Sequence, residues 1–229
     1  MSLAPLHLAG ERIMLCPSGV ALWPAARTLV AADLHLEKGS HFAARGRMLP
    51  PYDTRATLER LARALRRHDP ARVILLGDSF HDPGAPARMA PDDRALLLRL
   101  LEGRAVVWVL GNHDPTPPEA LPGAAVEARA EGPLLFRHIG GAPLPRHGGA
   151  EISGHFHPKA ALATRAGVVS RPCFLSDGRR LVLPALGAFS GGLDATDPAF
   201  APVFPRGARA FLLGAERLHS FTTRAARSA

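Results

Sequence analysis

The hydrophobic pattern of the first half of the chain predicts buried strands that end in polar residues. Three segments, 27–35 (RTLVAADLH), 71–79 (ARVILLGDS) and 105–114 (AVVWVLGNHD), run through aliphatic residues into Asp, Asn or His. Continuous apolar runs of this length are typical of strands buried on both faces. Because chemistry in α/β sheets gathers beyond the carboxyl ends of strands, these segments predict one shared site. It would contain Asp33, Asp78 and Asn112.

Two segments between these strands have a helical pattern. Segment 53–69 carries Leu58, Leu61 and Leu65 at helical spacing, with Asp53 as the candidate cap. Segment 91–103 begins with Pro and acidic residues and ends in Gly, which are helix boundary signals. The arginines of the first helix lie mostly away from its apolar stripe, so we expect a solvated face for Arg60, Arg63, Arg66 and Arg67.

The second half of the chain is rich in short strands and Gly-containing turns. The predicted strands are 133–138, 150–155, 172–176, 179–186 and 209–214, with a long loop over 187–208. We predict two β-sheets packed together with helices outside, in one domain over 1–229. Its core would span about 10–215, with a mobile tail from about 222 to 229. The apolar segment 198–204 (PAFAPVF) could pack on its own chain or on a partner, and the oligomeric state stays open.

Composition places the chain among globular proteins of the cytoplasm. Hydrophobic residues make up 47%, and no apolar run approaches the ~18 residues of a membrane span. The N-terminus lacks the basic start and uninterrupted apolar stretch of a signal peptide. The two cysteines, Cys16 and Cys173, lie far apart among apolar neighbours, which favours buried free thiols.

The net charge of +8 is compatible with a nucleic-acid partner. Almost all of the positive charge is arginine, and the chain is rich in Ala, Gly and Pro. Such a bias also arises from genome composition, so the charge alone leaves both explanations open.

The polar strand ends form a set of candidate metal ligands. In chain order they are D33-x-H35, G77-D78, G111-N112-H113-D114, H138 and G154-H155-x-H157. Carboxylate, amide and imidazole donors together suit Mn²⁺, Fe²⁺ or Zn²⁺, and the absence of cysteine argues against a structural zinc site. Two metals that share a carboxylate would need roughly this many ligands.

This order of motifs resembles the calcineurin-like metallophosphoesterases. The resemblance implies a four-layer α/β/β/α sandwich, in which two mixed β-sheets are flanked by helices. Carried over motif by motif, it implies a first metal held by Asp33, His35 and His157. It implies a second metal held by Asn112, His138 and His155, with Asp78 bridging the pair.

Longer stretches within 15–195 resemble the ligase-associated DNA-damage-response endonucleases of PdeM type. They include VAADLHLEKGSHFAARGRMLPPYDT, LLGDSFHD, ISGHFHPKA and CFLSDGRRLVLPALGAFSGGL. Typical relatives have Thr-Gly-Gly where this chain has Ser190-Gly191-Gly192, which keeps the hydroxyl. The resemblance implies a Mn²⁺-dependent phosphodiesterase or endonuclease acting on DNA in bacterial repair. Its functional partners would be an ATP-dependent DNA ligase, a helicase and a second nuclease.

The expected reaction is attack of a metal-bridging hydroxide on the phosphodiester. His113, next to the ligand Asn112, is the candidate general acid for the leaving alkoxide, and Asp114 would orient its imidazole. His81 would either contact substrate or support a ligand. Lys38, Arg45 and Arg47 would either rim the site or be ordinary loop charge, and for Phe42 and Tyr52 core packing is favoured over base stacking.

Two other functions stay open at this stage. An enzyme of the same fold could act on a small substrate, such as a cyclic nucleotide or a nucleotide-sugar diphosphate. A scaffold without catalysis is less favoured, because every ligand position and His113 are filled.

Overall fold

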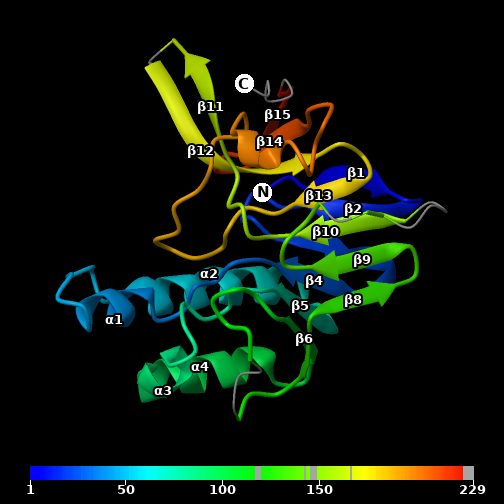
Figure 1. Ribbon diagram of the computed structural model, residues 1–229. Helices are drawn as coiled ribbons and strands as arrows, with labels where there is room; N and C mark the ends of the chain where they lie inside the picture. Colours follow the sequence, from blue (N-terminus) through cyan, green and yellow to red (C-terminus); the bar gives the residue numbers. More distant parts are fainter. Residues whose placement is uncertain (117–119, 142, 145–148, 166, 224–229) are drawn as a thin grey trace.

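The computed structural model describes residues 1–116, 120–141, 143–144, 149–165 and 167–223. Its first sheet contains seven strands in the order β1 to β7 (Figure 1). The first four strands pair antiparallel, and β4 to β7 pair parallel. Their bounds are β1 Ala4–Leu8, β2 Glu11–Leu15, β3 Ala21–Trp23, β4 Thr28–Ala31, β5 Arg72–Leu76, β6 Ala105–Val109 and β7 Ala124–Val126.

The second sheet faces the first and is also mixed. Its strand order is β15-β14-β12-β13-β10-β9-β8, and β11 pairs with β12 outside this path. Strands β9, β10 and β13 run parallel, and the other pairs are antiparallel. Their bounds are β8 Ala128–Glu131, β9 Leu134–Arg137, β10 Ala150–Ser153, β11 Lys159–Thr164, β12 Gly167–Ser176, β13 Arg180–Val182, β14 Arg209–Leu213 and β15 Leu218–Thr222.

The α-helices lie on the side of the first sheet that faces away from the second (Figure 1). They are α1 Lys38–Ala43, α2 Asp53–His68, α3 Ala85–Arg88 and α4 Pro91–Leu101, with 3₁₀ turns η1 Pro24–Ala26 and η2 Pro198–Phe200. Helix α2 buries the predicted stripe of Leu58, Leu61 and Leu65. Asp53 does not cap α2 as predicted. Its carboxylate accepts a hydrogen bond from the Gly39 N–H (2.9 Å) and so joins α2 to α1.

Three buried clusters fill the spaces between these layers. The first lies between the helices and the first sheet, and includes Leu58 and Val73. The second lies between the two sheets, and includes Ile74 and Phe136. The third lies on the outer face of the second sheet, where Phe200 packs in the segment that includes η2. The predicted pair of mixed sheets with helices is therefore confirmed, and the apolar 198–204 segment packs on its own chain.

Several elements were not predicted from the sequence. These are the helices α1 and α3 and the strands β1 to β3, β7, β8, β11 and β15. Thr222 ends β15 and Thr223 is buried, while the rest of the predicted mobile tail, 224–229, lies outside the described residues. Tyr52, for which core packing was favoured, is 68% exposed. Both cysteines are buried and free, as predicted.

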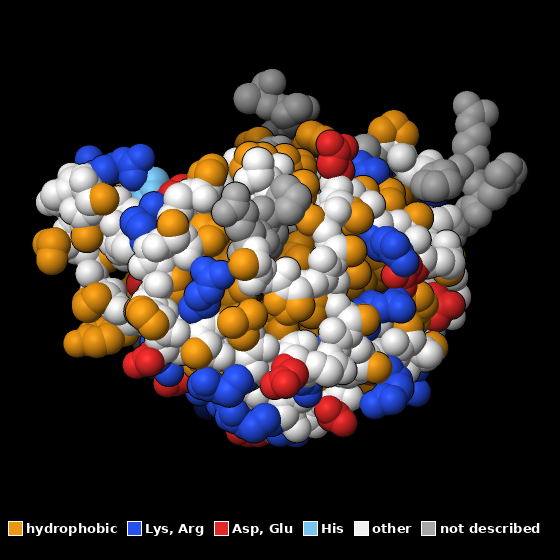
Figure 2. All heavy atoms as spheres, turned by 90° about the horizontal axis from the view of Figure 1, so that it is seen from below, with side chains coloured by type: hydrophobic (Ala, Val, Ile, Leu, Met, Phe, Trp, Pro, Cys, Tyr) orange, Lys and Arg blue, Asp and Glu red, His pale blue; other side chains and the backbone are white. Residues whose placement is uncertain are grey.

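Two features concern the surface. Strands β11 and β12 form an arm that extends away from the body of the molecule (Figure 1). On the face seen from the helix side, basic side chains form separate groups with acidic ones among them (Figure 2). The positive net charge is therefore not concentrated on that face. None of the described helices is long and apolar enough to cross a membrane.

Truncation of Phe136 tests the packing between the sheets. Its side chain is fully buried, and its ring lies 6.2 Å from that of Trp23. We expect Phe136→Ala to lower the free energy of unfolding by about 3–5 kcal/mol, because it leaves a cavity in the core. Urea denaturation measures the loss. Val168→Ala on the exposed arm is the control, with an expected change within about 0.5 kcal/mol, and equal losses would contradict this view of the core.

Candidate metal centre

The predicted ligands lie in loops that follow β4, β5, β6, β9 and β10. Backbone hydrogen bonds join the first two of these loops: the Asp33 N–H donates to the Gly77 carbonyl (3.3 Å) and the His35 N–H to the Asp78 carbonyl (2.8 Å). The Gly154 N–H donates to the His138 carbonyl (3.0 Å), which joins the loops of the second sheet. The site therefore lies where the ends of both sheets meet.

Most of these residues have left-handed backbone conformations. Such φ values are uncommon outside glycine, although Asp, Asn and His adopt them more readily than other residues. Residues held in this way cluster at functional sites, where the surrounding structure enforces them. The residues, with φ between 45° and 72°, are Asp33, His35, Asp78, His155 and His157.

One group of ligand atoms comes from Asp33, His35 and His157. The two imidazole Nε2 atoms are 3.2 Å apart, and His157 Nε2 is 3.3 Å from Asp33 Oδ1. All three ligand atoms lie within 4.8 Å of one another. This is the set that the family resemblance implied for a first metal.

A second group comes from Asp78, His138 and His155. His138 Nε2 lies 3.3 Å from Asp78 Oδ2 and 3.2 Å from His155 Nδ1. Asn112 joins this group, with its Oδ1 3.0 Å from His138 Nε2. Asp78 Oδ2 is also 3.8 Å from His35 Nε2, so Asp78 lies between the two groups, as the bridging assignment requires.

The donor set fits divalent metal ions. Asp33 and Asp78 are 0% and 2% exposed, and imidazole nitrogens of different loops face them. Buried carboxylates are stable only when paired or bound to metal. Mixed oxygen and imidazole donors suit borderline divalent ions. The residues present here could hold two such ions.

The electrostatics of the ligands are strongly coupled. Burial lowers the pKa of His35 to about 2, with a further contribution from His157. Burial also disfavours the charged form of His138, but the hydrogen bond to Asp78 and the charge of Asp33 outweigh it and raise the pKa of His138 to about 9. Without metal, a proton on His138 therefore balances the carboxylates.

His113 lies beside this centre, next to two other histidines. Its ring stacks on that of His81 at 5.0 Å and meets the edge of His35 at 5.1 Å. Its Nδ1 lies 2.8 Å from the His81 carbonyl oxygen, which can only accept, so Nδ1 carries the proton. The other ring nitrogen, Nε2, is thus left for proton transfer.

Asp114 lies elsewhere than predicted. Its carboxylate does not contact the His113 imidazole. It accepts hydrogen bonds from the backbone N–H groups of Asp78, Ser79, Phe80 and Gly111, at 2.7–3.1 Å. Burial raises the pKa of Asp114 to about 6 despite these bonds. Asp114 therefore positions the loop that carries Asp78, and the His81 carbonyl orients His113.

The other predicted substrate residues do not gather in one place. His81 lies in the centre, with Nδ1 3.3 Å from His35 Nδ1. Lys38 donates to the Phe189 carbonyl (3.1 Å), and Arg45 lies 2.6 Å from the ring of His41. Arg47 is exposed.

Sequence reasoning missed a network on the α1 side of the site. Asp82 pairs with Arg88, and its carboxylate lies 2.7 Å from His41 Nδ1. The His41 ring meets the edge of His81 at 4.6 Å. The sequence held a weak signal for it: His81 and Asp82 are adjacent in the GDSFHD motif.

The arginines of α2 are exposed, as predicted. The sequence did not show that Arg60 also lines a cavity of about 360 Å³ together with His157 and Lys159. The helical spacing of Arg60, Arg63 and Arg67 was the signal that could have indicated a shared surface.

Comparison with known proteins identifies the family. Residues 26–167 match the model of the calcineurin-like phosphoesterase family. The crystal structure of Pseudomonas putida nuclease MPE has 31% identity, covers 96% of this chain and 100% of its own, and gives a TM-score of 0.72. YfcE, a phosphoesterase from E. coli, has 15% identity, covers 85% of this chain and 97% of its own, and gives a TM-score of 0.44. No curated protein matches the chain.

Metal addition should stabilise the protein increasingly as the pH rises. The pKa of His138 is raised to about 9, so protonation of its imidazole stabilises the metal-free protein. This stabilisation is complete below pH ~6.5 and is lost as the pH rises towards 9. Metal needs the neutral imidazole. We therefore expect a fixed concentration of Mn²⁺ to raise the Tm more at pH 8.5 than at pH 6.5. If that concentration is 100 times the Kd at pH 8.5, the stabilisation there is about 2–3 kcal/mol.

Asp78→Asn tests the bridging position in the same measurement. The amide removes the negative charge shared by both groups, so we expect the Mn²⁺-induced Tm increase and the hydrolytic activity to be lost together. His7→Ala, at an exposed position of β1, is the matched control and should behave as the parent. An undiminished Tm increase in Asp78→Asn would contradict the assignment.

Proposed function

Because this chain belongs to the calcineurin-like phosphoesterase family and is a metal-dependent phosphoesterase, we propose that its substrate is the phosphodiester backbone of DNA. The proposed activity is that of an endonuclease in DNA repair, of the ligase-associated PdeM type. Two observations support it: the 31% identity to a nuclease over 96% of the chain, and the net charge of +8. The observation that carries it is the pair of donor groups joined by Asp78, with His113 beside them.

The metals would be held by the residues already described. Asp33, His35 and His157 would bind one ion, Asn112, His138 and His155 the other, and Asp78 both. When bound, such a pair offsets the charge of the phosphate and lowers the pKa of a coordinated water. We propose Mn²⁺, because the set combines carboxylate and amide oxygen with imidazole and contains no thiolate. Fe²⁺ and Zn²⁺ are the alternatives.

His113 would supply the proton to the leaving alkoxide. The His81 carbonyl holds its Nδ1–H, so the proton is donated from Nε2. General acid catalysis of this kind contributes typically 10²–10⁴-fold. Asp114 is a positioning residue in this scheme, because it holds the Asp78 loop through backbone N–H groups and touches no reacting atom.

Several further parts of the proposal concern the cellular setting. We propose that the enzyme works in the cytoplasm, beside an ATP-dependent DNA ligase, a helicase and a second nuclease. This part rests on the resemblance of the longer motifs in 15–195 to the ligase-associated endonucleases.

A panel of labelled substrates tests the substrate class. Single-stranded, duplex and nicked DNA are compared with bis(p-nitrophenyl) phosphate and a cyclic nucleotide, each with Mn²⁺. We expect cleavage of at least one DNA form at a higher kcat/KM than that of the cyclic nucleotide. Hydrolysis of the small diesters without cleavage of any DNA would overturn the proposal and favour a small-nucleotide phosphodiesterase.

His113→Ala tests the proton donor. We expect the variant to keep its bound metal, because the Asp33–His35–His157 and Asp78–His138–His155 groups keep all their donors, and to cleave DNA about 10²–10⁴-fold more slowly. The loss should be smaller with bis(p-nitrophenyl) phosphate, because p-nitrophenolate leaves without protonation. Metal analysis and kcat on both substrates provide the measurement. DNA cleavage at the parental rate would show that another group donates the proton.

A further inference from the structure

A groove lined by basic residues leads from the metal centre along α2. It consists of two adjoining cavities of about 360 and 500 Å³, which share Arg60, Pro172 and Ala185. The first reaches the ligand His157, and the second continues past Arg63 to Arg67. We call these two cavities the α2 groove.

The charged side chains that line the α2 groove are all positive. Its lining includes four cationic side chains, Lys159, Arg60, Arg63 and Arg67, and no carboxylate. Burial and the neighbouring charge of Arg63 lower the pKa of Arg60, so these guanidinium groups lie close enough to repel each other. An anion between them would relieve this repulsion.

The position of Arg60 is fixed by the loop that follows β13. One of its terminal nitrogens, Nη1, donates to the carbonyls of Leu186 (3.1 Å) and Gly187 (3.3 Å). Lys38 donates to the same loop at the Phe189 carbonyl (3.1 Å). The remaining N–H groups of Arg60 are left for a ligand, since a guanidinium carries five. The cation at the mouth of the α2 groove is therefore held in place before any ligand binds.

The floor of the groove is apolar or lined by small side chains. Proline, alanine and leucine line the second cavity, including Pro172, Ala185 and Leu186. Ser190 lines the first cavity, and its hydroxyl has no hydrogen-bond partner among the described residues. Cationic walls over such a floor suit a strand whose phosphates face the arginines and the lysine.

The dimensions fit a single strand. Arg60 and Arg67 are seven residues apart on α2, or about 10 Å along the helix axis. Cavities of 360 and 500 Å³ are in the size range that takes a nucleotide-sized molecule.

We propose that the α2 groove binds the single-stranded flank of a nucleic acid next to the bond cleaved at the metal centre, through Lys159, Arg60, Arg63 and Arg67. This inference deepens the proposed function and rests on it. Contacts of this kind would position a backbone without reading its sequence.

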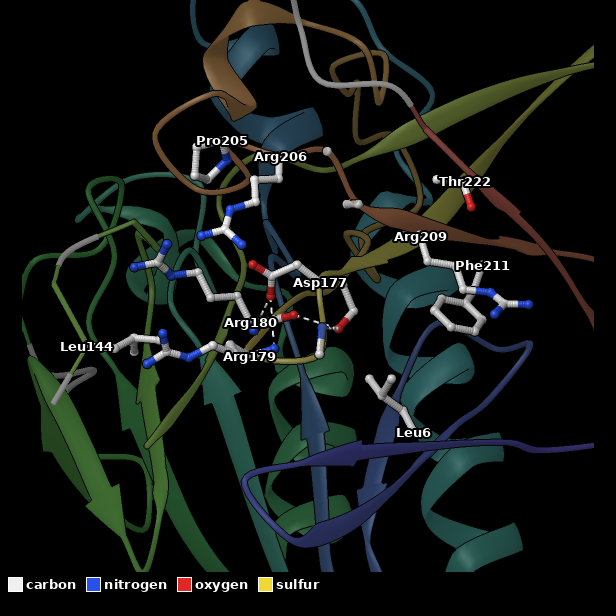
Figure 3. A pocket seen from close by; sticks show the side chains of 14 residues that line it. Leu6, Leu144, Asp177, Arg179, Arg180, Pro205, Arg206, Arg209, Phe211 and Thr222 are labelled. Carbon is white, nitrogen blue, oxygen red and sulfur yellow. Dashed lines mark hydrogen bonds between the residues drawn. The ribbon is translucent and has the colours of Figure 1, made fainter. Parts of the chain in front are cut away.

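A second basic cavity provides the matched control. It measures about 680 Å³ and is lined by Arg179, Arg180, Arg206 and Arg209 among others, and the Arg206 side chain points toward Asp177 in Figure 3. Arg180 pairs with Glu151 at the start of β13 and β10, whereas the ligands follow the ends of the strands. This cavity therefore lies at the opposite edge of the sheet from the metal centre. Arg206→Glu changes the same charge there.

The experiment compares Arg63→Glu and Lys159→Ala with Arg206→Glu. For each protein with Mn²⁺, kcat/KM is measured for a labelled oligothymidylate of ten nucleotides and for bis(p-nitrophenyl) phosphate, which has one phosphate and no flank. We expect the ratio of the two values to fall about tenfold in each groove variant, mainly through KM, and to stay within twofold of the parent in Arg206→Glu. The slope of log affinity against log salt should fall by about 0.7 for each cation lost.

Fluorescence anisotropy with the same oligonucleotide and Ca²⁺ separates this inference from the proposed function. If the parent binds the strand without cutting it and the groove variants bind more weakly, the groove proposal stands and the nuclease proposal fails. If the parent cuts the strand and the groove variants keep the parental ratio, the groove proposal is wrong and the nuclease proposal stands. An equal fall in Arg206→Glu would also overturn the groove, because net charge alone would explain it.

Discussion

Two carboxylates buried between the sheets impose the main constraint on this structure. Asp33 and Asp78 lie at the ends of parallel strands, almost without solvent contact. A buried charge must be met by an opposite charge or by hydrogen bonds, since desolvation alone would be strongly unfavourable. Both carboxylates accept backbone hydrogen bonds, from the His155 and His113 N–H groups respectively. The surrounding imidazoles provide the rest, either as protonated partners or as co-ligands of a metal.

The same constraint explains the glycines of the motifs. A Cβ on Gly154 would come within 2.6 Å of Asp33 Oδ2, and one on Gly77 would overlap the ring of His138. A Cβ on Gly111 would overlap Asp78 in the same way. In each case the glycine of one ligand loop leaves room for a ligand from another loop. The recurrent glycine before Asp, Asn or His is thus a packing requirement of a shared centre, and only secondarily a turn signal.

The sequence predicted the elements whose signal is local. The apolar runs that became β4, β5 and β6 are buried on both faces, and the leucine stripe of α2 has a clear helical period. Strand β1 was missed because its alternation is short and includes Pro5, and β11 because it is rich in alanine and exposed.

The contacts that the sequence did not predict share one physical reason. Asp114 follows His113 in the chain, but its carboxylate turns to the backbone of the Asp78 loop. Arg60 is exposed on α2 as predicted, yet it donates to the loop after β13 and lines a cavity there. Neither contact has a local signal, because each depends on which distant loop packs against the residue. The candidate ligands do come together, because they share one centre that constrains all of them together.

The surroundings of the centre differ on its two sides, and this difference bears on how a diester would bind. On the α1 side, His113, His81 and His41 form a continuous series of ring contacts, and Asp82 and Arg88 hold its outer end. On the α2 side, the groove begins at His157, and His113 lines neither of its cavities. A strand held in the α2 groove therefore leaves the centre by a route that His113 does not line. It follows that the groove would hold the part of the substrate that keeps the phosphate, while the alkoxide protonated by His113 departs on the side of the histidine series.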